Sequence, residues 1–389
     1  MKSSTEGRPL RVVVLTTDGR ELLKDYANGV PHFGTAPEAL LQGFSMTPGV
    51  EVHVVSCARR PMRSPAKLAE NVWFHSVQVP KIGWMTTAYQ GCIRTIRKTL
   101  RKIQPDIVHG QGTERDCAIS AVFSRFPNVL TIHGNMGLIA QVNKARPFSF
   151  NWLAAHLERM TIPRSLGVVC ITRYTQAAVS DLARRTWVVP NAVDATFFEV
   201  QAVPDEARTV LCVGNISYRK NQNFFIRALD EWAPANKIKL LFLGHTRKES
   251  AYDAEFLSLV QARPWCVYRG AVDRNKLKDH LRTASLLALP SLEDNCPMVV
   301  LEAMAAGVPV LAAKVGGVPD LIEEGKTGFF CDPLDAGTMR AGIERGLLDR
   351  STAGKVAKEA KARAHERFHP RVIAQRHVDI YREVLGRLP

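Results

Sequence analysis

Two carboxylates stand near the point where an expected strand gives way to an apolar helix. Asp294 lies in a polar loop, and Glu302 lies inside the run MVVLEAMAA. The free N–H groups and the dipole of a helix N-terminus attract phosphate groups. A carboxylate in an apolar helix is costly to bury without a partner. The pattern therefore leaves two interpretations of Glu302: a contact with a hydroxyl-rich ligand, or a side chain that points to solvent.

The loop before this helix supplies further candidate residues. Pro297 suits the first turn of a helix, and Asn295 or Cys296 is expected near its N-cap. Met298 opens the apolar run, and Gly307 suits the left-handed position that ends a helix. We expect this helix tip to bind an anion.

A second turn of the same kind follows the next expected strand. Gly316 and Gly317 lead into a helix that is expected to begin near Pro319. Glycines allow the backbone to approach a ligand closely, again beside a helix N-terminus. The turn is therefore a second place where a ligand would meet the backbone.

Both turns belong to a regular alternation of short apolar runs and amphipathic segments. A first set of expected strands covers residues 11–17, 52–57, 106–110, 128–134 and 167–171. A second set covers residues 209–214, 238–244, 265–270, 285–290, 308–313 and 327–331. Helical patterns lie at residues 86–103, 113–124, 221–233 and 274–284. Apolar strands that alternate with helices indicate parallel sheets covered on both faces.

This alternation predicts an α/β chain of two Rossmann-like domains that face each other across a cleft. The domains are expected at residues 1–190 and 191–370, with residues 190–208 as a linker between the two strand sets. A C-terminal helix over residues 371–389 is expected to pack back on the N-terminal domain. Ligands of such sheets bind beyond the carboxyl ends of the strands.

The composition narrows the class of protein. A chain of 389 residues, 46% of them hydrophobic, is long enough for two domains and is not disordered throughout. We expect no signal peptide and no transmembrane helix, and the eight scattered cysteines indicate buried, reduced thiols. A cytoplasmic protein is therefore expected, either free or peripheral at the inner face of a membrane.

Positive charge exceeds negative charge, with a formal net charge of +15. Part of the excess lies in residues 94–102, where Ile93, Ile96 and Leu100 stand at helical spacing between basic residues. Two interpretations remain open: a basic amphipathic helix that contacts an anionic membrane, and a solvated helix face. Zinc-finger spacing and basic-aromatic interleaving are absent from the sequence, so no nucleic-acid partner is expected.

The segment of residues 290–331 resembles the signature of glycosyltransferase family 4, the retaining glycosyltransferases of GT-B fold. That signature has two acidic residues separated by seven others, then E-A-M-A-x-G-x-P-V and a G-G turn. Glu302 begins the matching EAMAAGVPV, and the first acidic position falls on Asp294, where the family usually has Glu. Glu293 stands beside it, so the resemblance leaves open which of the two carboxylates faces the sugar.

The resemblance continues at residues 213–229, which are similar to the family's Gly-Arg…Lys-Gly segment. Lys220 stands at the position of the diphosphate-binding lysine. Asn215 replaces the usual arginine beside the glycine, and Arg219 is a candidate to supply the missing charge. Two cations beside a diphosphate would stabilise the charge that develops on a leaving group.

Three further positions follow from the same resemblance. Residues 188–198 are similar to the family's interdomain segment, and TIHG at residues 131–134 matches the end of a family strand. By this match His133 lies at the cleft and contacts the transferred sugar. Gly34 is the candidate for the family's N-terminal glycine loop on the acceptor side, although the usual double glycine is missing.

The resemblance implies a retaining transfer of a hexose from a nucleotide sugar to an acceptor hydroxyl. The N-terminal domain would take the acceptor, and the C-terminal domain the donor, with a UDP- or GDP-sugar expected. Glu302 would bind the ribose hydroxyls, and Asp294 or Glu293 the sugar. The expected acceptor is a sugar or a lipid-linked sugar of surface polysaccharide or glycolipid synthesis. No cofactor and no essential metal ion are expected.

Two other functions stay open at this point. A nucleotide-sugar epimerase of the same fold would use the same donor without an acceptor. A non-catalytic sugar-nucleotide-binding protein would explain the departures at Asn215 and Asp294.

Two lookalike patterns and one absence exclude other enzyme classes. HERFH at residues 365–369 matches H-E-x-x-H, but Pro370 breaks the helix that such a zinc site needs. GQGTER at residues 110–115 has Arg115 in place of the third glycine of a dinucleotide fingerprint. No D-x-D occurs in the sequence, which argues against the metal-dependent, single-Rossmann glycosyltransferases.

Overall fold

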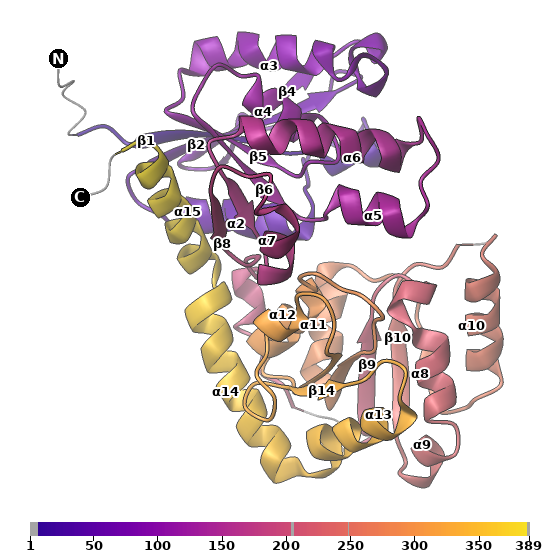
Figure 1. Ribbon diagram of the computed structural model, residues 1–389. Coiled ribbons are helices and arrows are strands. Elements are labelled where there is room, and N and C mark those ends of the chain that lie inside the picture. Colours follow the sequence, from indigo (N-terminus) through magenta and orange to yellow (C-terminus); the bar gives the residue numbers. More distant parts are fainter. Residues whose placement is uncertain (1–6, 204–205, 248, 387–389) are drawn as a thin grey trace. The chain divides into compact units, whose positions relative to one another are not determined.

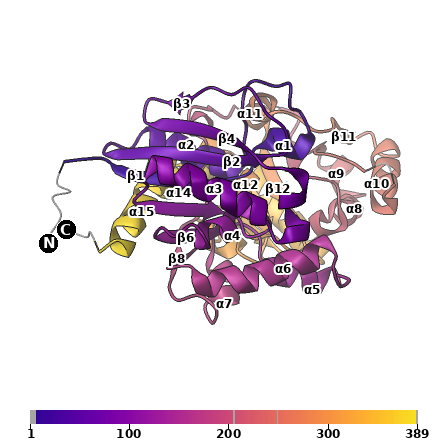
Figure 2. The ribbon, with the colours of Figure 1, turned by 90° about the horizontal axis from the view of Figure 1, so that it is seen from above.

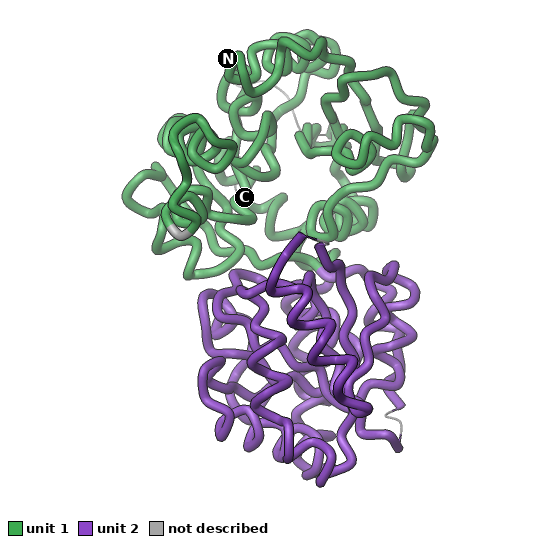
Figure 3. The backbone as a smooth tube through the Cα atoms, turned by 90° about the vertical axis from the view of Figure 1, so that its right-hand side faces the viewer, with its two compact units in different colours: residues 1–192, 370–389 green, residues 193–369 purple. Residues whose placement is uncertain are grey.

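The computed structural model describes residues 7–203, 206–247 and 249–386. The chain divides into two compact units (Figure 3). Unit 1 comprises residues 1–192 and 370–389, and unit 2 comprises residues 193–369. Each unit is an α/β fold around a largely parallel sheet, so the prediction of two α/β domains is confirmed.

Unit 1 contains an eight-stranded sheet in the order β3-β4-β2-β1-β5-β6-β7-β8. All pairs are parallel except β3 with β4. The strands are β1 (Leu10–Leu15), β2 (Val50–Ala58), β3 (Lys67–Ala69), β4 (Val72–Gln78), β5 (Ile107–Gln111), β6 (Asn128–Ile132), β7 (Val168–Cys170) and β8 (Thr186–Val188). The five predicted strands are present. Sequence analysis missed β3, β4 and β8, which include the edge strands of the sheet, where polar residues interrupt the apolar pattern.

Helices cover both faces of this sheet (Figures 1 and 2). They are α1 (Gly19–Leu23), α2 (Thr35–Ser45), α3 (Gln90–Ile103), α4 (Asp116–Val122), α5 (Met136–Val142), α6 (Phe150–Thr161), α7 (Arg173–Val179) and α15 (Pro370–Val384). Alternate residues of β1 point to opposite faces: Val12 and Val14 pack with α2 and α15, whereas Val13 and Leu15 pack with α3 and α4. Burial on both faces explains why residues 12–15 of this strand are all apolar.

Unit 2 contains a six-stranded parallel sheet in the order β11-β10-β9-β12-β13-β14. The strands are β9 (Thr209–Val213), β10 (Lys239–Leu243), β11 (Cys266–Tyr268), β12 (Leu286–Leu289), β13 (Val310–Ala313) and β14 (Phe329–Cys331). The helices are α8 (Gln222–Ala228), α9 (Trp232–Ala235), α10 (Ala251–Gln261), α11 (Arg274–Thr283), α12 (Met298–Ala306), α13 (Ala336–Ile343) and α14 (Arg350–Phe368). All six strands predicted for this half are present.

Three predicted helix boundaries were wrong. The segment of residues 221–233 holds two helices, α8 and α9, rather than one. Only a 3₁₀ turn, Val318–Asp320, occurs near Pro319. Pro297 is the N-cap of α12 instead of its first-turn residue, with φ −65° and ψ 111°. The predicted C-terminal stop is confirmed, because Gly307 caps α12 in the left-handed region with φ 77°.

The structure can be compared with the predictions about the cysteines, the membrane-spanning helices and the H-E-x-x-H pattern. All eight cysteines are free and buried, as predicted. Within the described residues, no helix combines the length and the apolar character that a membrane span requires. Helix α14 ends at Phe368, and α15 starts at Pro370, so the H-E-x-x-H pattern stands at a helix break.

Candidate functional site

The carboxyl ends of parallel strands gather the candidate residues of unit 2 at one edge of its sheet. The loop after β9 carries Lys220, the loop after β12 carries Asp294, and the loop after β13 carries Gly316. In parallel sheets the carboxyl ends share one edge, which is where ligands bind. The fold therefore brings together residues that are up to 96 positions apart in the sequence, between 220 and 316.

Lys220 and Asp294 form an ion pair at this edge. The Lys220 Nζ lies 2.5 Å from Asp294 Oδ2, and Ser291 Oγ donates to the same carboxylate oxygen at 3.2 Å. Both charged side chains are largely buried, with 14% and 10% exposed. The pair therefore holds one positive and one negative group at the end of β12, largely out of water.

Arg219 and Glu293 form the outer part of the same cluster. The Arg219 Nη1 donates to the Glu293 carbonyl oxygen at 2.8 Å and lies 3.4 Å from its carboxylate. It also lies 3.5 Å from Asp294 Oδ1. The side chains of Arg219 and Glu293 are about half exposed, unlike Asp294. Asp294 is thus the inner carboxylate of the two.

Gly316 fixes the backbone of Asp294. A Cβ atom at Gly316 would lie 2.1 Å from the Asp294 carbonyl oxygen, and the residue has φ 52°. The Gly317 N–H donates to that same oxygen at 3.0 Å. The close approach that the two glycines predict is therefore made here to the Asp294 backbone.

Glu302 is buried and pairs with an arginine that sequence analysis missed. Its side chain is 2% exposed, and its Oε1 accepts a hydrogen bond from Arg274 Nη1 at 2.7 Å. Burial raises the pKa of Glu302, while the nearby Arg274 guanidinium lowers it. The interpretation that Glu302 points to solvent was wrong. The only signal for Arg274 in the sequence was a basic residue at the start of a predicted helix.

Arg274 is itself held in place by an aromatic ring. Its guanidinium carbon lies 4.7 Å from the centroid of the Phe197 ring. Its side chain is 38% exposed, so one end of the ion pair reaches solvent. The Arg274 guanidinium thereby favours the charged form of the Glu302 carboxylate, whose oxygen lone pairs can accept further hydrogen bonds.

The remaining predicted donor-site residues lie at the tip of α12 and at the start of the loop after β9. Met298 begins α12, and Asn295 and Cys296 precede its cap, with Cys296 buried. Asn215 is exposed, and its carbonyl oxygen accepts a hydrogen bond from Gln222 Nε2 at 3.2 Å. Its side chain adds no positive charge at the position where the family has arginine.

His133 lies in unit 1, directly after β6. Its Nε2 is 2.8 Å from Gln111 Oε1, at the end of the neighbouring strand β5. The Gln111 Nε2 in turn lies 3.2 Å from His109 Nε2, and His109 Nδ1 lies 2.5 Å from the hydroxyl of Tyr381 in α15. Burial lowers the pKa of His133 and of His109, so both imidazoles are neutral near neutral pH.

Gly34 has no property that requires glycine. It is the exposed N-cap of α2 with φ −60°, and a Cβ atom there would meet only Pro37 Cδ at 3.6 Å. Gly19, which sequence analysis did not single out, is the tight position of this region. A Cβ atom at Gly19 would lie 2.0 Å from the His32 ring.

Two family models match adjacent parts of the chain. Residues 38–197 match the model described as Glycosyltransferase Family 4, and residues 193–363 match Glycosyl transferases group 1. The chain belongs to glycosyltransferase family 4. Lys220, Asp294 and Glu302 of this family 4 chain all lie within the second match.

Curated relatives match parts of the chain. An uncharacterized glycosyltransferase of Methanocaldococcus jannaschii is 28% identical over 188 residues, which are 48% of this chain and 48% of the relative. The chain thus spans about half the length of that relative, and 30% and 24% of two other curated relatives.

Solved structures share the fold over nearly the whole chain. A sucrose-phosphate synthase from Thermosynechococcus elongatus has a TM-score of 0.77 at 18% identity, covering 97% of this chain and 99% of that one. HepE of Anabaena, solved in complex with UDP-glucose, has a TM-score of 0.69 at 18% identity, with 97% and 100% covered. Both likenesses concern the fold of this family 4 chain.

Proposed function

We propose that this chain is a retaining glycosyltransferase that moves a hexose from a nucleotide sugar to an acceptor hydroxyl. The acceptor would be a sugar or a lipid-linked sugar of surface polysaccharide or glycolipid synthesis, and no metal ion would take part in the transfer. Family membership supports transfer rather than epimerisation or simple binding. The observation that carries the proposal is the Lys220–Asp294 ion pair at the carboxyl edge of the unit 2 sheet.

This ion pair has the properties that a diphosphate site needs. A diphosphate that enters the site would compete with Asp294 for the Lys220 ammonium group, which is largely withdrawn from water. Charges in such surroundings interact more strongly than in bulk water. Lys220 would then stabilise the charge that develops on the departing nucleoside diphosphate, with Arg219 beside it as a second cation. Asp294, released from Lys220, would contact the donor sugar.

Glu302 and Arg274 would recognise the ribose. A charged carboxylate accepts hydrogen bonds from two vicinal hydroxyls, and Arg274 favours the charged form of Glu302 against the effect of its burial. The backbone N–H groups at the start of α12 would add donors for the phosphates. The donor is expected to be a UDP- or GDP-sugar; HepE, a neighbour in fold, was solved with UDP-glucose.

Thermal unfolding in the presence of UDP, GDP, ADP and CMP tests the donor site. A ligand at 100 times its dissociation constant stabilises a protein by about 2.7 kcal/mol, which raises the melting temperature measurably. We expect one nucleotide to do so in the wild-type chain and in Arg227→Ala. Arg227 forms an exposed ion pair with Glu255 on α8 and α10 and serves as the matched charge control. The absence of a shift with every nucleotide would contradict the proposal.

Analysis of products then separates transfer from epimerisation. The chain is incubated with the nucleotide sugar that binds, first without and then with a panel of sugar and lipid-linked sugar acceptors. A glycosylated acceptor with the anomeric configuration of the donor is the expected result. Isomerised sugar nucleotide in the absence of any acceptor would instead identify an epimerase.

We also propose that unit 1 contacts an anionic membrane through α3. This helix carries five basic residues and no acidic one, and its buried face consists of Cys92, Ile93, Ile96, Leu100 and Ile103. Lys98 and Arg101 are exposed on the opposite face. An exposed basic face is attracted to anionic headgroups by about 1 kcal/mol for each basic residue.

Sedimentation with liposomes tests the membrane contact. The wild-type chain should bind vesicles that contain anionic lipid at low salt and release them at high salt. The variant Lys98→Gln/Arg101→Gln should bind less, whereas Lys355→Gln/Lys358→Gln, which removes two exposed charges from α14, should not. Equal binding by the two variants would show that α3 is not the contact.

A further inference from the structure

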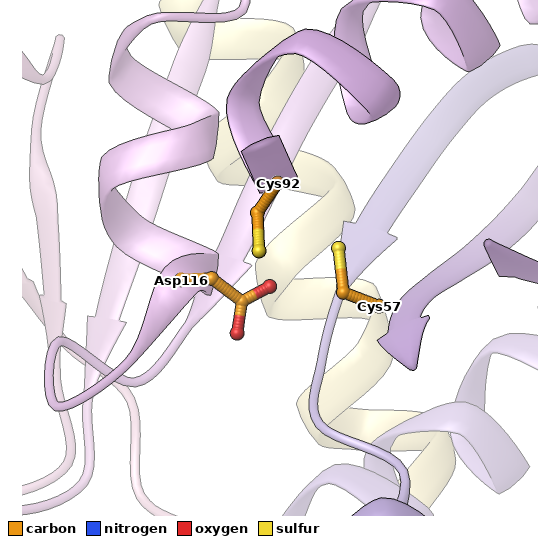
Figure 4. Close-up of side chains that lie close together, drawn as sticks. All are labelled: Cys57, Cys92 and Asp116. Carbon is orange, nitrogen blue, oxygen red and sulfur yellow. The ribbon is translucent and has the colours of Figure 1, made fainter. Parts of the chain in front are cut away.

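Two cysteines and an aspartate meet in unit 1, outside the candidate donor site of unit 2 (Figure 4). Cys57 lies near the end of β2, Cys92 in the first turn of α3, and Asp116 is the first residue of α4. One ligand atom from each lies within 4.8 Å of the other two, and all three residues are buried. In the described part of the chain, this is the one group of three such donors.

The three side chains point toward a common centre in Figure 4. Two thiols and a carboxylate are a donor set that suits zinc, which binds sulfur at about 2.3 Å and carboxylate oxygen at about 2.0–2.2 Å. Donor atoms that share one tetrahedral zinc ion are therefore roughly 3.5–3.8 Å apart. Atoms that already lie within 4.8 Å reach this spacing by small side-chain rotations.

We propose that Cys57, Cys92 and Asp116 form a binding site for a zinc ion in unit 1. Three protein ligands leave the fourth tetrahedral position to a water molecule. On binding, the two thiols lose their protons to solvent and become thiolates, and the carboxylate binds in its charged form. The centre then carries one net negative charge, next to the guanidinium group of Arg115.

The electrostatics of the cluster without a cation favour this assignment. Asp116 is 5% exposed and forms no ion pair with an arginine, lysine or histidine among the described residues. A divalent cation would place positive charge directly against this carboxylate, whose charged form is costly to bury.

The location indicates what the ion would do. Cys57 lies near the end of β2, and Asp116 follows β5. These two strands flank β1 in the sheet, and Cys92 belongs to the helix that covers them. The strand order reverses on either side of β1, and the carboxyl ends at such a reversal form the binding crevice of an open α/β sheet. Zinc would tie α3 and α4 to this edge, and so would stabilise the wall of unit 1 without taking part in the transfer.

Cobalt binding tests the site, because Co²⁺ takes the place of Zn²⁺ and its thiolate bonds absorb visible and near-ultraviolet light. The reduced, metal-free full chain is titrated with Co²⁺, and Zn²⁺ is then added to displace it. We expect one Co²⁺ for each chain, with charge-transfer absorption from two thiolates. Cys57→Ser and Cys92→Ser should each lose about half of that absorption, because each removes one of the two thiolates. Each should also weaken Co²⁺ binding by more than about 100-fold, which exceeds the effect of removing a residue that only hydrogen-bonds to a metal ligand.

Matched controls keep the test decisive. Cys212→Ser changes a buried free cysteine of unit 2 and should leave the titration unchanged. X-ray absorption at the zinc edge of the wild-type chain should show two sulfur neighbours together with oxygen neighbours. This measurement uses no variant, so it does not depend on whether a variant folds. No cobalt spectrum in the wild-type chain, a sulfur-free zinc shell, or unchanged binding by both Cys57→Ser and Cys92→Ser would overturn the proposal.

Discussion

Arg274 and Glu302 are joined by a 2.7 Å hydrogen bond between Nη1 and Oε1, although their positions in the sequence differ by 28. Glu302 is buried in α12, whereas Arg274 begins α11 and remains 38% exposed. The arginine therefore compensates a carboxylate that would otherwise be isolated in an apolar helix. Since Glu302 also belongs to the proposed donor site, loss of this pair should affect both the stability of unit 2 and the donor site.

Arg274→Ala is expected to lower the free energy of unfolding by about 2–3 kcal/mol, because it leaves a buried carboxylate without its charged partner. Glu302→Gln should cost less, since it leaves no buried charge. Chemical denaturation of both single variants and of the double variant measures the difference. A double variant that loses the full sum of the single effects would contradict a direct pairing.

The effect of Arg274→Ala should depend on pH. Burial raises the folded-state pKa of Glu302, and removing Arg274 raises it further. As the pH falls through that pKa, Glu302 binds a proton and no longer requires a partner, so the difference in unfolding free energy between wild type and Arg274→Ala should shrink toward acidic pH. A difference that is constant from neutral to acidic pH would be inconsistent with this explanation.

Lys220→Ala is expected to weaken nucleotide binding by about 10-fold to 100-fold, the equivalent of one charge-assisted hydrogen bond. Titration calorimetry with the nucleotide that stabilises the wild type measures the change, with Arg227→Ala as the charge control. The same titration in EDTA should give an unchanged dissociation constant, because the proposed donor site holds no metal ion. A loss of affinity in EDTA would show that a cation contributes to donor binding.

Gly316→Ala should disturb the candidate site through the backbone. The new Cβ atom would lie 2.1 Å from the Asp294 carbonyl oxygen at a φ of 52°. We expect a loss of at least about 1 kcal/mol in stability, together with weaker nucleotide binding. Gly34→Ala is the matched control, since the nearest atom to its Cβ is 3.6 Å away. Equal nucleotide affinities in the two variants would show that the Gly316 backbone does not shape the nucleotide site.

His377 is expected to make unit 1 sensitive to acid. Burial lowers its folded-state pKa to about 4, and its Nε2 has no hydrogen-bond partner among the described residues. Below about pH 6.5 the unfolded chain therefore binds a proton at His377, whereas the folded chain does not. The free energy of unfolding falls for this reason by up to about 3 kcal/mol as the pH drops from about 6.5 to 4. His377→Phe should flatten this dependence in pH-dependent denaturation, whereas His156→Phe, an exposed change in α6, should not.

The sequence alone determined the class of fold and the family. Strands that are buried on both faces are largely apolar, and this made β1, β2, β9 and β10 visible in the sequence. The acidic pair and EAMA segment likewise identified the family, because these signals are local. The edge strands β3 and β8 are short and partly exposed, so the same argument could not find them.

Only the tertiary structure decided which residues contact one another across the fold. Arg274 faces Glu302, Gly316 packs against the Asp294 backbone, and Cys57 meets Cys92 and Asp116. Each of these contacts joins residues from different strand–helix units, which approach one another only because parallel strands end at a common edge. Residue types and spacing indicated which groups carry chemistry, whereas the pairing of those groups depends on sheet order and helix packing, which no local pattern encodes.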